Sequence, residues 1–137
     1  MLIKPAKFER MLAIRLNSGD DILAKLEEMT AKEKLRNAVI LTGLGSLNAY
    51  HYHVVSTGVL PPENAFMKGE EALDIVNING VVLEGRVHAH ITVSNTEKAF
   101  GGHMEPGCRV LTFAVIVVGV VSEPDFTGWD SFDIMNG

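Results

Sequence analysis

The clearest alternation of apolar and polar residues in the chain runs from Leu83 to Ser94. Apart from Gly85, its odd positions are apolar and its even positions polar (Leu83, Val87, Ala89, Ile91 and Val93 against Glu84, Arg86, His88, His90, Thr92 and Ser94). Successive side chains of a strand point to opposite faces of a sheet, so this period of two predicts a half-buried strand. His88 and His90 then share the polar face, with Cα atoms roughly 6.6 Å apart along the strand.

This strand is expected to belong to a long hairpin. The β-rich runs Glu70 to Ile78 and Val81 to Val93 flank Asn79-Gly80, and Asn-Gly between such runs is a strong signal for a two-residue turn. After the second run the chain is expected to turn again and return antiparallel. That return brings His103 towards His90.

Four further segments have the pattern of strands. Phe8 to Leu16 alternates, and Asn37 to Thr42 is a short apolar run. Leu47 to Val55 is rich in Tyr and Val, which favour strands. The long apolar run Val110 to Val121 is expected to be a central strand, or one buried at a contact between subunits.

One helix is expected from about Gly19 to Lys34. Ser18 fits the N-cap position, and two aspartates follow near the positive end of the helix dipole. Apolar residues at helical spacing predict the side that faces the core (Ile22, Leu23, Leu26 and Met29).

Two motifs between these elements have a structural and a functional interpretation. Gly43-Leu44-Gly45-Ser46 follows a strand, as phosphate-binding loops do, but no helix opens after it, so a bend or bulge is favoured. His51 and His53 share one face of a strand. Because no third ligand lies near them in the sequence, we favour a sheet surface backed by Tyr50 and Tyr52 over a second metal site.

Together these elements predict an α+β fold, with a mixed, mainly antiparallel sheet and one main helix near the N-terminus. A chain of 137 residues is expected to form a single domain over 1–137. The tail from Glu123 to Gly137 carries Trp129, two Phe and three Asp. We interpret it as an irregular segment that packs back on its own subunit or on a neighbour.

Composition limits the location and the partners. The longest apolar run is about 12 residues, well short of the ~20 that a membrane helix needs, so no membrane partner is expected. The N-terminus lacks the features of a secretory signal and Cys108 is the single cysteine, which predicts a cytoplasmic location. A net charge of −5 with scattered basic residues argues against strong sequence-independent binding of nucleic acid. No nucleic-acid-binding residue is assigned.

His88, His90 and His103 are the candidate ligands of one divalent metal ion; the alternative is a polar sheet face without metal. Three neutral imidazoles leave the fourth position of a tetrahedral ion open, which suits Lewis-acid chemistry or binding of a small anion. Zn²⁺ is expected first, with Ni²⁺, Fe²⁺ or Mn²⁺ as alternatives. The candidates for the fourth ligand, or for hydrogen bonding to the ligands, are Glu105, Glu84 and a carboxylate from a neighbouring chain.

Arg86 lies two residues before His88 on the same face. It is a candidate for binding an anionic ligand, and a surface ion pair with Glu84 or Glu70 is the equal alternative. No pair of general acid and base is evident, so the catalytic residues are unknown from the sequence.

The run from Gly80 to Gly107, with His88-Ala89-His90 and Gly101-Gly102-His103, resembles the plant-and-prokaryote-conserved (PPC) domain family, in its prokaryotic stand-alone form. The resemblance covers nearly the whole chain and includes Arg15, Gly19 and Gly43-Leu44-Gly45-Ser46. It implies an α+β domain that assembles as a homotrimer and binds a metal through the three histidines.

The chain departs from this family in two places. Plant members accompany AT-hook segments in DNA-associated regulators, which implies DNA as a partner, but this sequence has no Arg-Gly-Arg-Pro segment. Family members often carry a Glu in the strand after the Gly-Gly-His loop, where this chain has the apolar Phe113-Ala114-Val115-Ile116.

The three histidines are also similar to those of acetolactate decarboxylase, in which zinc polarises a carbonyl, but the catalytic acids of that enzyme have no counterpart here. Two functions of different classes follow. The favoured one is a trimeric, metal-binding module with a regulatory or ligand-sensing role and no catalysis. The alternative is a metal-dependent lyase or hydrolase that acts on a small anionic substrate.

Overall fold

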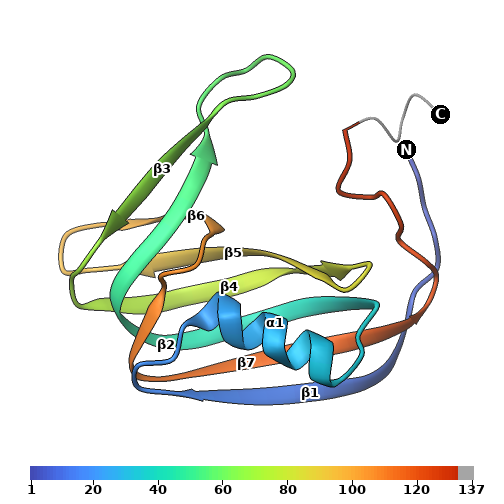
Figure 1. The fold of residues 1–137 in the computed structure, drawn as a ribbon, viewed down its shortest axis with the longest axis horizontal. Helices are drawn as coiled ribbons and strands as arrows, with labels where there is room; N and C mark the ends of the chain where they lie inside the picture. The colour runs from blue at the N-terminus through green and yellow to red at the C-terminus, as the bar shows by residue number, and fades with distance from the viewer. Residues whose placement is uncertain (133–137) are drawn as a thin grey trace.

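A computed structural model describes residues 1–132. Over these residues the chain consists mainly of strands, with one short helix (Figure 1). In chain order the elements are β1 (Lys7–Asn17), α1 (Ile22–Lys32), β2 (Asn37–Val55), β3 (Asn64–Gly69), β4 (Leu73–Leu83), β5 (Arg86–Ser94), β6 (Ala99–Met104) and β7 (Arg109–Glu123). The predicted α+β class is confirmed. No helix within the described residues is long and apolar enough to cross a membrane.

The long strand β2 organises the sheet. The strand order is β1-β7-β2-β4-β5-β6, and the last part of β2 leaves this path to pair with β3 and with β6 (Figure 1). Because β2 contacts strands at both ends of the β4-β5-β6 run, the sheet curls until β6 meets β2. Every pairing among the named strands is antiparallel, so the mixed character that we expected is absent from residues 1–132.

The bend of β2 lies at its glycine-rich stretch. The pairing with β7 shifts register after Ile40 and again after Gly45, which confirms the predicted bulge. Gly45 has φ +146°, and a Cβ there would lie 2.2 Å from the carbonyl oxygen of Phe113. A residue without a side chain therefore lets β7 approach the bulged strand, and the two predicted strands before and after the motif are one continuous strand.

Helix α1 begins later than predicted. Its N-cap is Asp21, whose side chain accepts a hydrogen bond from the backbone N–H of Ala24 at 3.0 Å, so the assignment of Ser18 was wrong. The backbone N–H groups of Gly19 and Ile22 instead donate to the carbonyls of Val110 and Cys108. These tertiary bonds hold residues 19–21 against the start of β7 and keep them out of the helix.

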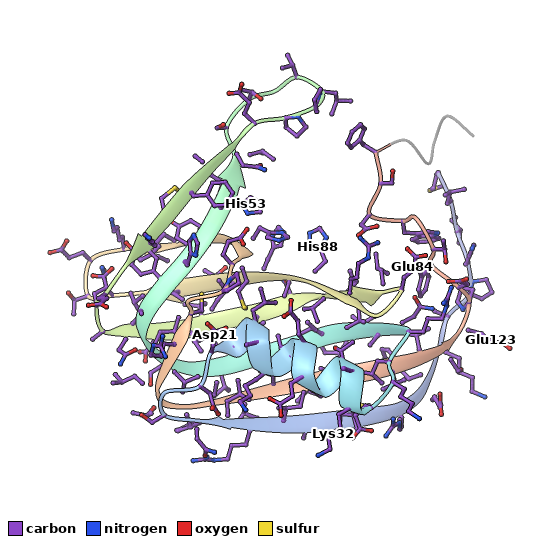
Figure 2. The ribbon with its side chains drawn as sticks, in the orientation of Figure 1. Asp21, Lys32, His53, Glu84, His88 and Glu123 are labelled. Atoms are coloured by element: carbon purple, nitrogen blue, oxygen red, sulfur yellow. The ribbon has the colours of Figure 1, made fainter. Side chains whose placement is uncertain are left out.

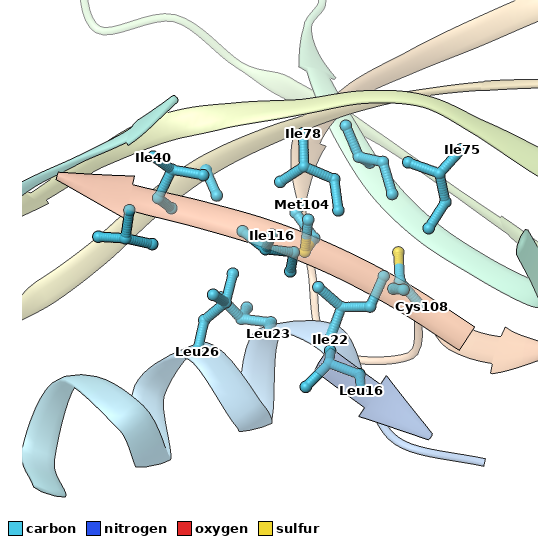
Figure 3. Close-up of a cluster of buried hydrophobic side chains, with 14 of the residues drawn as sticks. Leu16, Ile22, Leu23, Leu26, Ile40, Ile75, Ile78, Met104, Cys108 and Ile116 are labelled. Atoms are coloured by element: carbon cyan, nitrogen blue, oxygen red, sulfur yellow. The ribbon is translucent and has the colours of Figure 1, made fainter. Parts of the chain in front are cut away.

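The apolar side of α1 is confirmed as the side that faces the core. Ile22 and Leu26 are buried, and Figure 3 shows them facing Ile116 of β7 and Met104 of β6. Complete burial of one such side chain contributes roughly 1.5–3 kcal/mol. This contact fixes α1 on the inner side of the curled sheet.

The hairpin of β4 and β5 is confirmed, but its turn was wrongly placed. Asn79-Gly80 lies inside β4, and the turn is formed by Glu84 and Gly85, which have φ of +52° and +77°. Two successive positive φ values are what a type I′ turn requires. Gly80 is needed for a different reason, since a Cβ there would lie 2.3 Å from the carbonyl oxygen of His88 on β5.

The C-terminal segment packs on its own chain as far as it is described. The rings of Phe126 and Trp129 meet edge to face at 4.9 Å, and Asp125 forms an ion pair with Arg36 at 3.2 Å. The predicted return onto the subunit is therefore confirmed for residues 124–132. The remainder of the predicted tail, including Asp133, lies outside the described residues.

Candidate metal centre

Strands β5 and β6 bring the three predicted ligands together. His90 and His103 are directly opposite in the β5–β6 register, and His88 follows on the same face of β5. One ring nitrogen from each lies within 4.8 Å of the others, and the ring centroids of His88 and His103 are 4.7 Å apart. Figure 2 shows His88 on the side of the sheet that faces His53. Three imidazole nitrogens at this separation fit one divalent ion.

The alternation of β5 explains why the histidines converge. Ala89 and Ile91 are buried in the core at 1% and 2% exposure, so the intervening side chains must point away from it. The apolar residues thus fix the face on which His88 and His90 stand.

The two glycines before His103 allow β6 to fit between its neighbours. A Cβ on Gly101 would lie 1.9 Å from the carbonyl oxygen of Ile91 on β5, and one on Gly102 would lie 2.5 Å from that of His53 on β2. Only a backbone without side chains lies this close to both strands. The two glycines of Gly-Gly-His are therefore a packing requirement, and they place the candidate ligand His103 beside β5.

Burial keeps part of this histidine cluster neutral. Desolvation, together with the neighbouring His53, His88 and His90, lowers the pKa of His103 to about 4. Desolvation first, then the charges of His88 and His53, also lower the pKa of His90. A neutral imidazole is the form that binds a metal, so His90 and His103 stay in the binding form to a lower pH than a free histidine would.

His53 is a member of the site that the sequence did not reveal. It lies opposite His103 in the β2–β6 pairing, its ring stacks on that of His103 at 4.2 Å, and its Nδ1 lies 2.5 Å from Oε1 of Glu105. His53, His103 and Glu105 form a second group whose ligand atoms lie within 4.8 Å of one another. The shared face of His51 and His53 was the available signal, but the third ligand lies some 50 residues away in sequence, on β6.

The other predicted site residues have different positions. Glu105 belongs to the second ligand group, with His53 and His103, and is not part of the group formed by His88, His90 and His103. Glu84 lies in the turn after β4 and belongs to neither ligand group. Arg86 is paired with Glu84 at 3.3 Å and with Asp130 at 3.5 Å, which is the ion-pair alternative. His51 directs its Nδ1 to the carbonyl oxygen of Pro106 at 2.8 Å, outside the cluster.

Two hollows meet at the histidines. One, of about 600 Å³, is lined by His53 and His103. The other, of about 530 Å³, extends towards Trp129. His88 and His90 line both, so an ion held by them would be reached from either side.

The model of the Plants and Prokaryotes Conserved (PCC) domain matches residues 3–122. The chain belongs to this family. The PCC fold is the one described above, and the resemblance stated from the sequence motifs is confirmed.

Two solved structures share this fold, and a curated protein matches the chain by sequence. A plant- and prokaryote-conserved protein of Pyrococcus horikoshii superposes with a TM-score of 0.77 at 22% identity, covering 91% of this chain and 87% of that one. A metal-containing protein of Archaeoglobus fulgidus gives 0.75 at 18% identity, covering 88% and 86%. The bifunctional protein GlmU of a Synechococcus strain is 29% identical over 119 residues, which are 86% of this chain but 18% of that protein. The PCC chain therefore spans about a fifth of the length of this curated relative.

Two further structures bear on function only through their names. A protein of Bacteroides thetaiotaomicron, named for DNA binding, superposes with a TM-score of 0.73 at 18% identity, covering 86% and 85% of the two chains. A protein of Staphylococcus aureus described as similar to alpha-acetolactate decarboxylase gives 0.50 at 20% identity, covering 81% and 52%. At these identities the likeness concerns the fold.

Proposed function

We propose that this PCC-domain protein is a homotrimeric module with one domain per chain. It binds a divalent transition metal at His88, His90 and His103, and Zn²⁺ is the favoured metal. Its role is regulatory or ligand-sensing. The observation that carries the proposal is the convergence of three imidazoles from β5 and β6 on one point at the junction of two hollows. The archaeal relative named for its metal content supports the metal.

The residues present fit such an ion. Nitrogen ligands suit zinc and its neighbours in the transition series, and a lowered pKa at two of the three histidines leaves them neutral for binding. The bound ion would supply Lewis-acid character at its open position. The chain itself would orient the site through Glu105, whose carboxylate holds the His53 ring that stacks on His103.

An exposed apolar patch supports assembly into a trimer. Leu44 of β2 is 53% exposed, and Leu111 and Phe113 of β7 are each 39% exposed. The three side chains border one shallow hollow on the outer side of the sheet. Large apolar patches on a soluble protein mark contact surfaces, and strand β7 was expected from its sequence to be buried on both faces.

An alternative function is a metal-dependent lyase or hydrolase for a small anionic substrate. The observation that favours it is the pair of hollows that give access to the ion's open position. The sequence offers no evident pair of general acid and base, which favours the non-catalytic role, whereas the hydrogen-bonded pair of His53 and Glu105 beside His103 favours the alternative. Metal-loaded protein that turns over none of a panel of small keto and hydroxy acids would exclude the alternative.

DNA is the weaker choice of partner. The name of the Bacteroides relative supports it, but a net charge of −5 opposes binding through phosphates. Binding to duplex DNA that is absent, or that does not weaken between low and moderate salt, would exclude phosphate recognition.

The metal proposal is tested by elemental analysis of protein purified without a histidine tag. We expect about one ion per chain in the native protein and in His51→Ala, and loss of the ion in the His88→Ala/His90→Ala double variant. Less than one ion per three chains in the native protein would refute the proposal. Light scattering of the same samples tests the trimer, which should persist when the ion is lost.

A further inference from the structure

We propose that the hollow on the Trp129 side of the metal centre binds the apolar arm of a small carboxylate, with the carboxylate at His88 and His90. This inference rests on the proposed metal centre and specifies the class of ligand that it takes. The hollow measures about 530 Å³, within the ~300–1,000 Å³ of pockets that bind small organic molecules.

The floor of the hollow is an apolar extension of the histidine row. Val39 of β2 is directly opposite Val81 of β4, and Val81 is directly opposite His88 of β5. Side chains directly opposite one another on adjacent strands point to the same face of a sheet. Their neighbours Ile40 and Val82 are buried on the other face, at 2% and 0% exposure. A ligand at His88 therefore has two valines beside it on one surface.

Two aromatic side chains of the C-terminal segment form a second part of the lining, which we call the aromatic wall. Phe126 and Trp129 line the hollow and pack edge to face at 4.9 Å. The segment is anchored on both sides of the pair, by Arg36 to Asp125 at 3.2 Å and by Arg86 to Asp130 at 3.5 Å. These exposed ion pairs favour the observed position of the wall, which reduces the entropy lost on binding.

The charge of the ligand would be selected at the metal centre, because the charged side chain that lines the hollow beside the histidines is the carboxylate of Asp130, which pairs with Arg86. The charge of Arg86 is already offset by Glu84 and Asp130, so the ion would supply the local positive charge. A carboxylate oxygen is a suitable ligand for such an ion. A wholly polar anion would leave the valines and aromatic rings unmatched, and a wholly apolar molecule would leave the open position of the ion unfilled. A carboxylate with a short apolar arm matches both.

The test is a titration of zinc-loaded full-length protein with acetate, butyrate, hexanoate and octanoate. Trp129 is the only tryptophan of the chain, so its fluorescence reports on this hollow. We expect the affinity to rise about threefold to fourfold per methylene group until the hollow is filled, from roughly 0.8 kcal/mol per buried methylene. Hexanol and inorganic phosphate, which each lack one half of the ligand, should bind more weakly than hexanoate.

Two variants of the lining and one control variant locate the arm by calorimetry. Trp129→Ala removes the wall and should lose most of the gain with chain length, whereas Phe132→Ala, an exposed aromatic of the same segment that does not line the hollow, should keep it. Val81→Phe fills the floor and should also lose the gain. Because Trp129 lies on a surface segment, its variant remains informative if Val81→Phe fails to fold.

The outcomes distinguish a failure of the apolar-arm proposal from a failure of the proposed metal centre. Protein that binds zinc but has equal affinity for acetate and hexanoate would overturn the apolar arm and leave the metal centre standing. A gain with length that survives in Trp129→Ala would also overturn it. Protein that binds no zinc would overturn the metal centre and this inference together.

Discussion

Removing the metal and lowering the pH should destabilise this protein through His103. Its pKa is about 4 in the fold, because of burial first and the neighbouring histidines next, and 6.5 as a free side chain. As the pH falls from about 6.5 to 4, the unfolded chain takes up a proton that folded His103 refuses, so stability is lost across this window. Below about pH 4 both states carry the proton, and this loss ends.

The magnitude follows from the two pKa values. A difference between 6.5 and about 4 corresponds to at most about 4 kcal/mol, at about 1.4 kcal/mol per pH unit. His103 is only partly buried, and solvent screens part of the effect, so we expect about 2 kcal/mol. That is a large share of the roughly 5–15 kcal/mol by which proteins of this kind are stable.

Urea unfolding in the presence of EDTA, at intervals between about pH 4 and 7, measures this loss. The His103→Asn variant lacks the titrating group, so its free energy of unfolding should depend less on pH than that of the native protein. His51→Asn removes a histidine outside the cluster and should keep the native slope. Parallel curves for the native protein and His103→Asn would refute the reasoning.

Three further predictions concern the parts that position the site. Gly101→Ala would place a Cβ 1.9 Å from the carbonyl oxygen of Ile91, so β6 must shift. We expect a destabilisation of about 3 kcal/mol by urea unfolding and a loss of zinc by elemental analysis. An unchanged metal content would contradict the packing role of Gly101. Asp21→Ala removes the N-cap and the bond to the N–H of Gly107, so thermal unfolding should report a loss of about 1–2 kcal/mol with the metal retained. Saturating zinc should raise the stability of the native protein by about 2.7 kcal/mol at 100 times the dissociation constant, and an equal rise in the His88→Ala/His90→Ala variant would place the ion elsewhere.

The alternation from Leu83 to Ser94 was enough to determine the face of β5, because a period of two has one structural meaning wherever one face is buried. It therefore predicted that His88 and His90 share a face, and the return of the chain predicted their meeting with His103. The apolar side of helix α1 also follows from local spacing alone, and its prediction was confirmed. The turn at Asn79-Gly80 failed because an Asn-Gly pair also fits a strand where a neighbouring backbone needs a glycine.

What only the tertiary structure decided are the contacts between segments far apart in the chain. His53 reaches the site because β2 bends at Gly45 and pairs with β6, and no pattern within β2 specifies that partner. The same folding places Trp129 near His88 and pairs Asp130 with Arg86. Sequence periodicity determines which face of a strand is buried, whereas the curling of the sheet determines which faces meet. The candidate ligands were therefore visible in the sequence, whereas the side chains that surround them were not.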